Sequence, residues 1–193
     1  MQAHVGSLPM SSSARWAGAA AWTEQALFEV LGGWAGSSSA PQVAVYFDSA
    51  SQHHAWRAQL WLERLPARLT GASGPDLVRA PWGGAAEALR GLSELDGDVE
   101  RLAAYCRVVL EWAVAGYRRW QRLCSPAADR PVLRVLSLVV GDSVADWQDG
   151  CSVLAEVMSL SEGGVAVAIT AGAAASSARI EELLLREGPP HIA

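Results

Sequence analysis

The chain has 193 residues, of which 51% are hydrophobic and 18% charged, and its formal net charge is −5. Its 15 basic residues are all arginines and are scattered among 20 acidic ones. Nucleic-acid binding needs basic residues clustered on one face, so we expect no nucleic-acid partner. No apolar stretch reaches the roughly 18 to 20 residues that cross a bilayer, so we expect no membrane partner either.

The cysteines and the N-terminus indicate a cellular compartment. Cys106, Cys124 and Cys151 lie far apart without the C-x-x-C spacing of metal or redox motifs. The N-terminus has no positively charged segment followed by an apolar run, so we expect no secretory signal. A sparse, odd set of cysteines then indicates reduced core thiols, and we predict a cytoplasmic protein.

The length of the chain suits a single domain with a sizeable core. Residues 1–13 contain glycine, proline and four serines, which predicts a flexible N-terminal tail. We expect one helical bundle over residues 14–188, followed by a short tail over residues 189–193.

Two helices are predicted in the first third of the chain. Apolar residues recur at helical spacing from Ala14, with Glu24 on the flank of their face, and Gly36 with the serines after it ends the helix. Pro41 suits the first turn of a second helix, which we expect to run to about Arg68.

A long irregular connection follows over residues 70–97, with one short helix expected at residues 85–92. Asp98 is predicted as the N-cap of a third helix. The apolar face of that helix is formed by Leu102, Tyr105, Cys106, Val109, Trp112, Ala113, Gly116, Trp120 and Leu123.

A fourth helix is predicted after the turn at residues 125–131, with Asp142 and Asp146 flanking its apolar stripe. That stripe contains Leu133, Leu136, Val140, Val144, Trp147, Cys151 and Leu154. A final helix of small residues is expected over residues 165–188. The pattern therefore predicts an all-α bundle of four long helices, with a long connection between helices 2 and 3 and an additional C-terminal helix.

The second predicted helix carries the most informative residue. His54 lies in the middle of an apolar stripe, where it is either a hydrogen-bonded core histidine or a general base oriented by a carboxylate. Glu24, Asp142 and Asp146 are the candidate carboxylates, and with His54 they form our candidate catalytic pocket. Asp142 and Asp146 lie one turn apart, so their charges need compensation. The candidates for that compensation are Arg57, Arg107, Arg134 or a bound cation.

Two segments carry a family resemblance. HHAWRAQLWLERLP on the second helix and ADRPVLRVLSLVVGDSVADWQDG around the fourth resemble ferritin-like proteins, most closely the poorly characterised actinobacterial ones. The resemblance implies a four-helix bundle that holds two iron or manganese ions. The ligands would be a Glu from each of two helices and Glu-x-x-His from each of the other two.

The ligand signature is incomplete in this chain. Ala50 and Ser51 stand three residues before His53 and His54, where carboxylates are required, and the predicted fourth helix has no histidine. We therefore predict that the di-metal site has been lost, and we expect no metal and no cofactor.

Three functions remain open at this point. The first is a metal-free subunit or stabilising partner of another enzyme, in specialised-metabolite biosynthesis, as a homo- or hetero-oligomer. The second is a metal-independent enzyme or small-molecule binder with His54 as base, and the third is a degenerate mono- or di-metal oxidase. Trp22, Trp56 and Trp82 lie off the apolar stripes and are candidates for lining a pocket or an interface.

Overall fold

The computed structural model describes residues 8–69 and 72–159, together with the single positions 174 and 178. Apart from positions 174 and 178, the predicted C-terminal helix lies outside these residues, as do the tail at 189–193 and most of the predicted N-terminal tail. The long helical rods of the bundle are α1 (Met10–Ser37), α2 (Pro41–Leu62), α4 (Asp98–Ala104) continued by η2 (Tyr105–Val109) and α5 (Leu110–Leu123), and α6 (Arg130–Ser159). The all-α prediction is confirmed.

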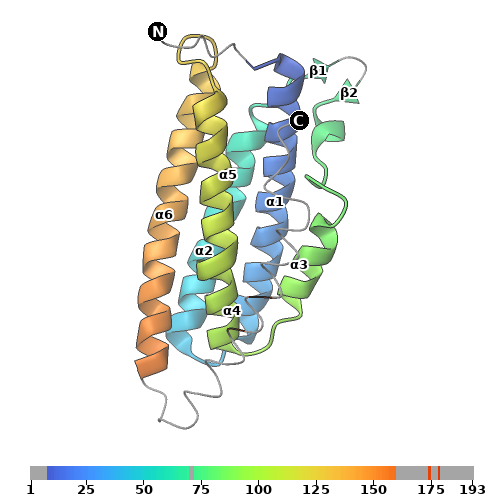
Figure 1. The fold of residues 1–193 in the computed structure, drawn as a ribbon. Helices are drawn as coiled ribbons and strands as arrows, with labels where there is room; N and C mark the ends of the chain where they lie inside the picture. The colour runs from blue at the N-terminus through green and yellow to red at the C-terminus, as the bar shows by residue number, and fades with distance from the viewer. Residues whose placement is uncertain (1–7, 70–71, 160–173, 175–177, 179–193) are drawn as a thin grey trace.

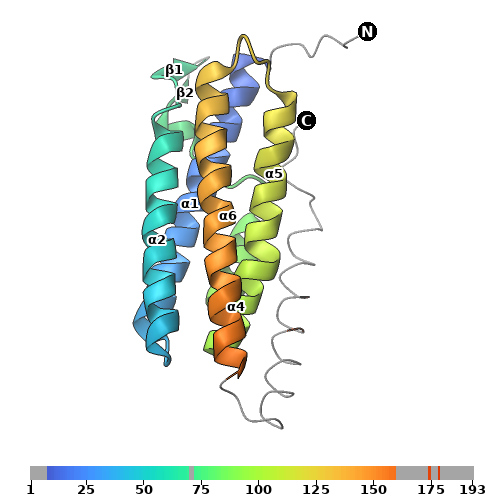
Figure 2. The same cartoon turned by 90° about the vertical axis from the view of Figure 1, so that its left-hand side faces the viewer.

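The segment between α2 and α4 sets the topology. It contains β1 (Arg68–Leu69), β2 (Ala72–Ser73), η1 (Pro75–Leu77) and α3 (Ala85–Ser93), and it runs back along the length of the bundle (Figure 1). The two strands form an antiparallel pair of two residues each. Because of this return, α2 and α5 run in the same direction, and α6 lies between them in the opposite direction (Figure 2).

Several helix boundaries differ from those predicted. α1 begins at Met10, inside the segment expected to be a tail, and α2 ends at Leu62 instead of near Arg68. Pro66 explains the early end of α2, since a proline disfavours helical geometry in the residue before it and cannot donate a backbone hydrogen bond.

Asp98 has a different role from the predicted one. Gly97, with a φ of 87°, is the N-cap of α4. The Oδ2 atom of Asp98 instead accepts hydrogen bonds from the backbone N–H of Ser39 at 3.0 Å and of Ala40 at 2.8 Å, and from the Ser39 hydroxyl at 2.8 Å. The carboxylate therefore caps the corner that begins α2 and ties it to the start of α4.

The apolar core is divided into two clusters. The Leu31 cluster includes Leu27, Leu31, Trp34, Phe47, Leu102, Leu110 and Leu154. The Trp61 cluster includes Ala17, Ala21, Trp61, Trp120, Leu136 and Val139. Between the two clusters, each of α1, α2 and α6 turns a charged or polar side chain inward: Glu24, His54 with Arg57, and Asp146.

The inward face of α6 is rotated relative to the predicted stripe. Its buried residues are Val135, Leu136, Val139, Ser143, Asp146, Gly150 and Leu154. Bulky residues of the predicted stripe, such as Trp147, are only partly buried, whereas small residues and Asp146 face the centre. Gly150 is required there, because a Cβ at this position would collide with the Tyr46 hydroxyl and the Cys106 thiol.

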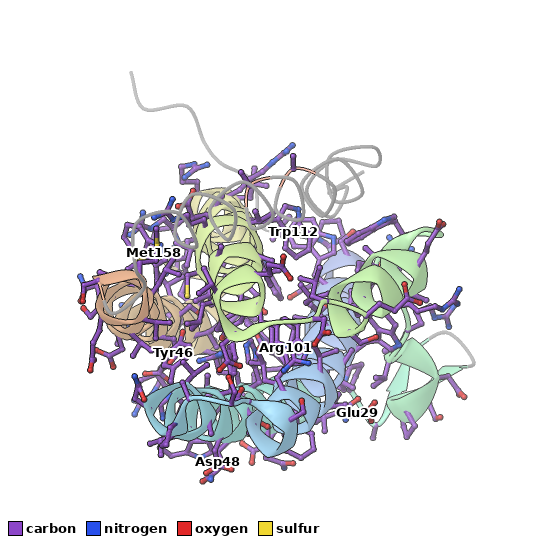
Figure 3. All side chains as sticks on the ribbon, turned by 90° about the horizontal axis from the view of Figure 1, so that it is seen from below. Glu29, Tyr46, Asp48, Arg101, Trp112 and Met158 are labelled. Carbon is purple, nitrogen blue, oxygen red and sulfur yellow. The ribbon has the colours of Figure 1, made fainter. Side chains whose placement is uncertain are left out.

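The predicted third helix is interrupted by the π-helical turn η2. A π turn contains an extra residue, so the inward face of the helix after it is rotated relative to the face before it. Tyr117 is therefore buried, whereas Trp112, Ala113 and Gly116 move from the predicted core to the flank of the bundle. Seen along the bundle, Tyr46 points into the interior and Asp48 points away from it (Figure 3).

Candidate functional site: a buried polar layer

Glu24 is the hub of the polar side chains between the two apolar clusters. Only 2% of it is exposed, and it lies on the buried face of α1, not on the predicted flank. Its Oε1 atom accepts a hydrogen bond from the Tyr117 hydroxyl at 2.5 Å. Its Oε2 atom lies 2.5 Å from His54 Nδ1 and accepts a hydrogen bond from Arg57 Nε at 3.1 Å.

Arg57 joins Glu24 on α1 to Asp146 on α6. Its guanidinium is fully buried, with 0% exposure, and its Nη1 atom donates to Asp146 Oδ2 at 2.7 Å. Burial acts to lower the pKa of Arg57, but the two carboxylates raise it, so the group stays charged. A single cation on α2 thus holds together two carboxylates from different helices.

The protonation of Glu24 follows from its donors. Burial alone would raise the pKa of this carboxyl group, yet Arg57, His54 and Tyr117 together hold its pKa at about 2. Glu24 is therefore an anion at neutral pH and accepts every hydrogen bond that it makes.

His54 is neutral and its tautomer is set by its neighbours. A carboxylate can only accept, so the proton is on Nδ1, which donates to Glu24. The Nε2 atom then accepts from the Tyr105 hydroxyl at 2.8 Å. Burial and the positive charge of Arg57 lower the pKa of His54. Both ring nitrogens are thus engaged in the folded bundle.

Asp146 connects the layer to the surface. Its Oδ1 atom lies 2.7 Å from Nδ1 of His53, whose side chain is 47% exposed. The backbone carbonyl of Asp146 accepts a hydrogen bond from the Tyr46 hydroxyl at 2.9 Å, and Tyr46 also lies 3.6 Å from the sulfur of Cys106.

All three tyrosines of the chain belong to this layer. Tyr105 comes from the π-helical turn, and Tyr117 reaches the interior because that turn rotates the face of α5. Burial raises the pKa of both phenols, so they remain hydrogen-bond donors at neutral pH. Together these residues form a chain of contacts through the middle of the bundle, which we call the polar layer: Glu24, Tyr46, His53, His54, Arg57, Tyr105, Tyr117 and Asp146.

The structure brings together three of the four candidate site residues. Glu24, His54 and Asp146 belong to the polar layer, whereas Asp142 is half-buried and makes no hydrogen bond or ion pair with the described residues. The sequence indicated Arg57 only as one of three candidate arginines, placed Tyr105 on an apolar face and gave no tyrosine a polar role. The sequence contained one signal for Arg57. It lies three residues after His54, so the two side chains share a helical face.

The donor set of the polar layer does not fit a metal ion. Both oxygens of Glu24 and both of Asp146 already meet N–H or O–H groups, and a guanidinium lies between the two side chains. A metal ion beside Arg57 would meet an unfavourable like charge. Within the described residues, no group of three or more His, Cys, Asp or Glu side chains is arranged to hold a metal ion.

No helix in the described part of the chain has the length and apolarity required to cross a membrane.

No protein-family model, curated protein or solved structure matches this chain. The polar layer is therefore the main guide to function.

Proposed function

We propose that this chain is a ferritin-like bundle in which an arginine has replaced the metal ions, and that it serves as a metal-free subunit or stabilising partner of another enzyme. Two features support the ferritin-like assignment. The bundle has one long connection, which makes α2 and α5 parallel, and its polar side chains gather in mid-bundle on facing helices. Ferritin-like proteins have both features.

The single observation that carries the loss of metal is the position of Arg57. A buried pair of carboxylates on two helices needs a positive charge between them, because unpaired buried charges are strongly unfavourable. In a di-metal protein the ions supply that charge. Here the guanidinium of Arg57 supplies it with two hydrogen bonds in fixed directions.

A non-catalytic role is favoured by the closed environment of His54. A general base needs a ring nitrogen within reach of its substrate, and both nitrogens of His54 are bonded inside the protein. His54 also does not line the cavity between α1 and α5, whose walls include Trp16, Trp112 and Trp120. These contacts suit a residue that holds helices together.

A partner surface is favoured on the outward face of α2. Val45 and Trp56 are 67% and 68% exposed, and the three turns of helix between them place them on the same side of α2. Aromatic side chains are enriched in protein interfaces, and the buried centre of an interface is more apolar than its rim. We propose that this face contacts the partner enzyme.

Elemental analysis tests the proposal that the bundle binds no metal. Wild-type protein, purified and then dialysed against iron and manganese salts, should retain neither metal. Arg57→Glu exchanges the cation for a third carboxylate, so this variant should take up about one equivalent of Mn²⁺ and gain thermal stability with it. Arg134→Glu, at an exposed position of α6, is the matched control and should bind none. Stoichiometric iron or manganese in the wild type would contradict the proposal.

The native mass of the purified protein tests the proposal that the chain binds a partner enzyme. The tagged chain, purified from its own cells, should elute as a defined complex heavier than its 20.4 kDa. The variant Val45→Ser/Trp56→Ser should elute as a monomer with an unchanged circular dichroism spectrum. A wild-type monomer without a stoichiometric partner would contradict the proposed partner role. It would not contradict the proposed loss of metal.

A further inference from the structure

A cavity lies on the flank of the bundle between α1 and α5. It has a volume of about 60 Å³, and its walls are almost entirely apolar. Its lining residues include the indole rings of Trp16, Trp112 and Trp120 and the small residues Ala19, Ala20, Ala113 and Gly116.

The π-helical turn creates this cavity. The rotation of α5 turns Trp112, Ala113 and Gly116 away from the bundle axis and toward α1. The residues of α1 that face them, Ala19 and Ala20, are also small, so the helices leave space that the tryptophan rings border but do not fill. Trp112 lies on this side of α5 (Figure 3).

A second, smaller cavity adjoins the first. It has a volume of about 30 Å³ and shares Thr23, Leu27 and Trp112 with it. Trp82 lines this second space, and its ring meets Trp112 edge-to-face at a centroid distance of 5.4 Å. Trp22 also lines it, so two of the three tryptophans predicted to line a pocket or an interface do line this cavity.

Three of the tryptophans that line these cavities carry an unpaired donor. The indole Nε1 atoms of Trp82, Trp112 and Trp120 are buried and have no hydrogen-bond partner in the described part of the chain. A buried donor without a partner is unfavourable, so an acceptor placed beside one stabilises the protein. Glu24 also touches the larger cavity, but its oxygens already accept hydrogen bonds from Tyr117, His54 and Arg57.

We propose that the cavity between α1 and α5 binds a small, largely apolar molecule that carries one hydrogen-bond acceptor, such as a ketone or an ester. The apolar walls favour a hydrocarbon body, and the indole N–H groups favour an uncharged oxygen. A water molecule needs at least about 10–15 Å³ of such space and occupies about 30 Å³ in the liquid, so the larger cavity takes a body of about two to four non-hydrogen atoms. This inference goes beyond the proposed function and does not depend on the absence of metal or on the partner surface.

The test compares two probes of four non-hydrogen atoms that differ only in the acceptor, acetone and 2-methylpropene. We expect both to bind, with acetone about fivefold tighter, as one hydrogen bond of average strength implies. Nitrogen-15 NMR of the indole N–H groups should show the Trp112 or Trp120 resonance moving to lower field with acetone and not with 2-methylpropene. Binding of neither probe, or equal binding of both, would overturn the proposal.

Variants locate the site. Trp120→Phe keeps an aromatic ring but removes one donor, and Trp112→Phe removes the other, so at least one of them should lose the preference for acetone. Ala113→Leu should abolish the binding of both probes by filling the space. Trp56→Phe, on the outward face of α2, is the matched control and should leave both affinities unchanged. A retained preference in both Trp112→Phe and Trp120→Phe would place the probe elsewhere and overturn the assignment.

Discussion

The polar layer and the apolar clusters on either side of it hold the same helices together by different physics. In the Leu31 and Trp61 clusters, stabilisation comes from apolar surface removed from water, which is non-directional and tolerates changes of shape that preserve volume. In the polar layer, each charge is buried, so its stability depends on partners at hydrogen-bond distance. The clusters favour compactness, whereas the layer requires α1, α2 and α6 to meet in one register.

The polar layer should be sensitive to a single change of charge. Two carboxylates face one guanidinium, and the neighbouring histidine is neutral. Removing the cation leaves two buried anions, while removing a methyl group from a cluster leaves only a cavity.

Arg57→Met should produce the largest loss. Breaking a buried ion pair on one side costs about 3–5 kcal/mol of the free energy of unfolding, and here one cation serves both Glu24 and Asp146. Urea denaturation followed by circular dichroism measures this value. The triple variant Glu24→Leu/Arg57→Met/Asp146→Leu removes all three charges and should be more stable than the single variant. If the single variant were as stable as the wild type, the layer would not depend on its charge balance.

Leu31→Ala, in the fully buried centre of its cluster, should cost about 3 kcal/mol through lost burial and the cavity that remains. Leu31→Met preserves volume and should cost less than about 1.5 kcal/mol. The same denaturation experiment compares these with Glu24→Gln, which preserves volume but not charge. Glu24→Gln should lower the free energy of unfolding more than Leu31→Met does. The reverse order would contradict the proposed difference between the polar layer and the apolar clusters.

Acid should destabilise the layer in two stages. His54 has a lowered pKa in the folded protein, so the unfolded chain binds a proton that the folded one does not, and stability falls as the pH drops below about 6.5. The pKa of Glu24 falls from its ordinary 4.5 to about 2, so its contribution, roughly 3 kcal/mol, is lost as the pH falls between these values.

Urea midpoints measured from pH 7 to pH 3 test both stages. Glu24→Gln should flatten the decline below pH 4.5. A wild-type midpoint that stays constant from pH 7 to pH 3 would contradict the charged state of Glu24.

Two aspartates outside the layer should give the smallest effects. Asp98→Ala removes the cap of the corner that begins α2 and should cost about 1 kcal/mol. Asp142→Ala, one turn before Asp146, should change the free energy of unfolding by less than about 0.5 kcal/mol. Thermal denaturation compares the two with Asp146→Ala, and similar losses for Asp142→Ala and Asp146→Ala would contradict the described layer.

Local patterns predicted the elements well and their faces less well. His54 lies on the buried face of α2, as its place in an apolar stripe predicted, and the short helix predicted at 85–92 agrees with α3. The predicted stripe of α6 was displaced, because bulky residues were expected in the interior. In the folded bundle Ser143, Asp146 and Gly150 occupy that interior, where Tyr46 and Arg57 need the space.

The helical class, the long connection after α2 and the inward position of His54 could be predicted from the amino-acid sequence alone. These follow from spacing, helix breakers and residue chemistry, which act over a few residues. Which charged residues meet depends on the tertiary packing. The π-helical turn at Tyr105 rotates α5, the inward face of α6 depends on its neighbours, and Arg57 lies between carboxylates 33 and 89 residues away along the chain. Such contacts depend on the packing of whole helices, so no local pattern encodes them.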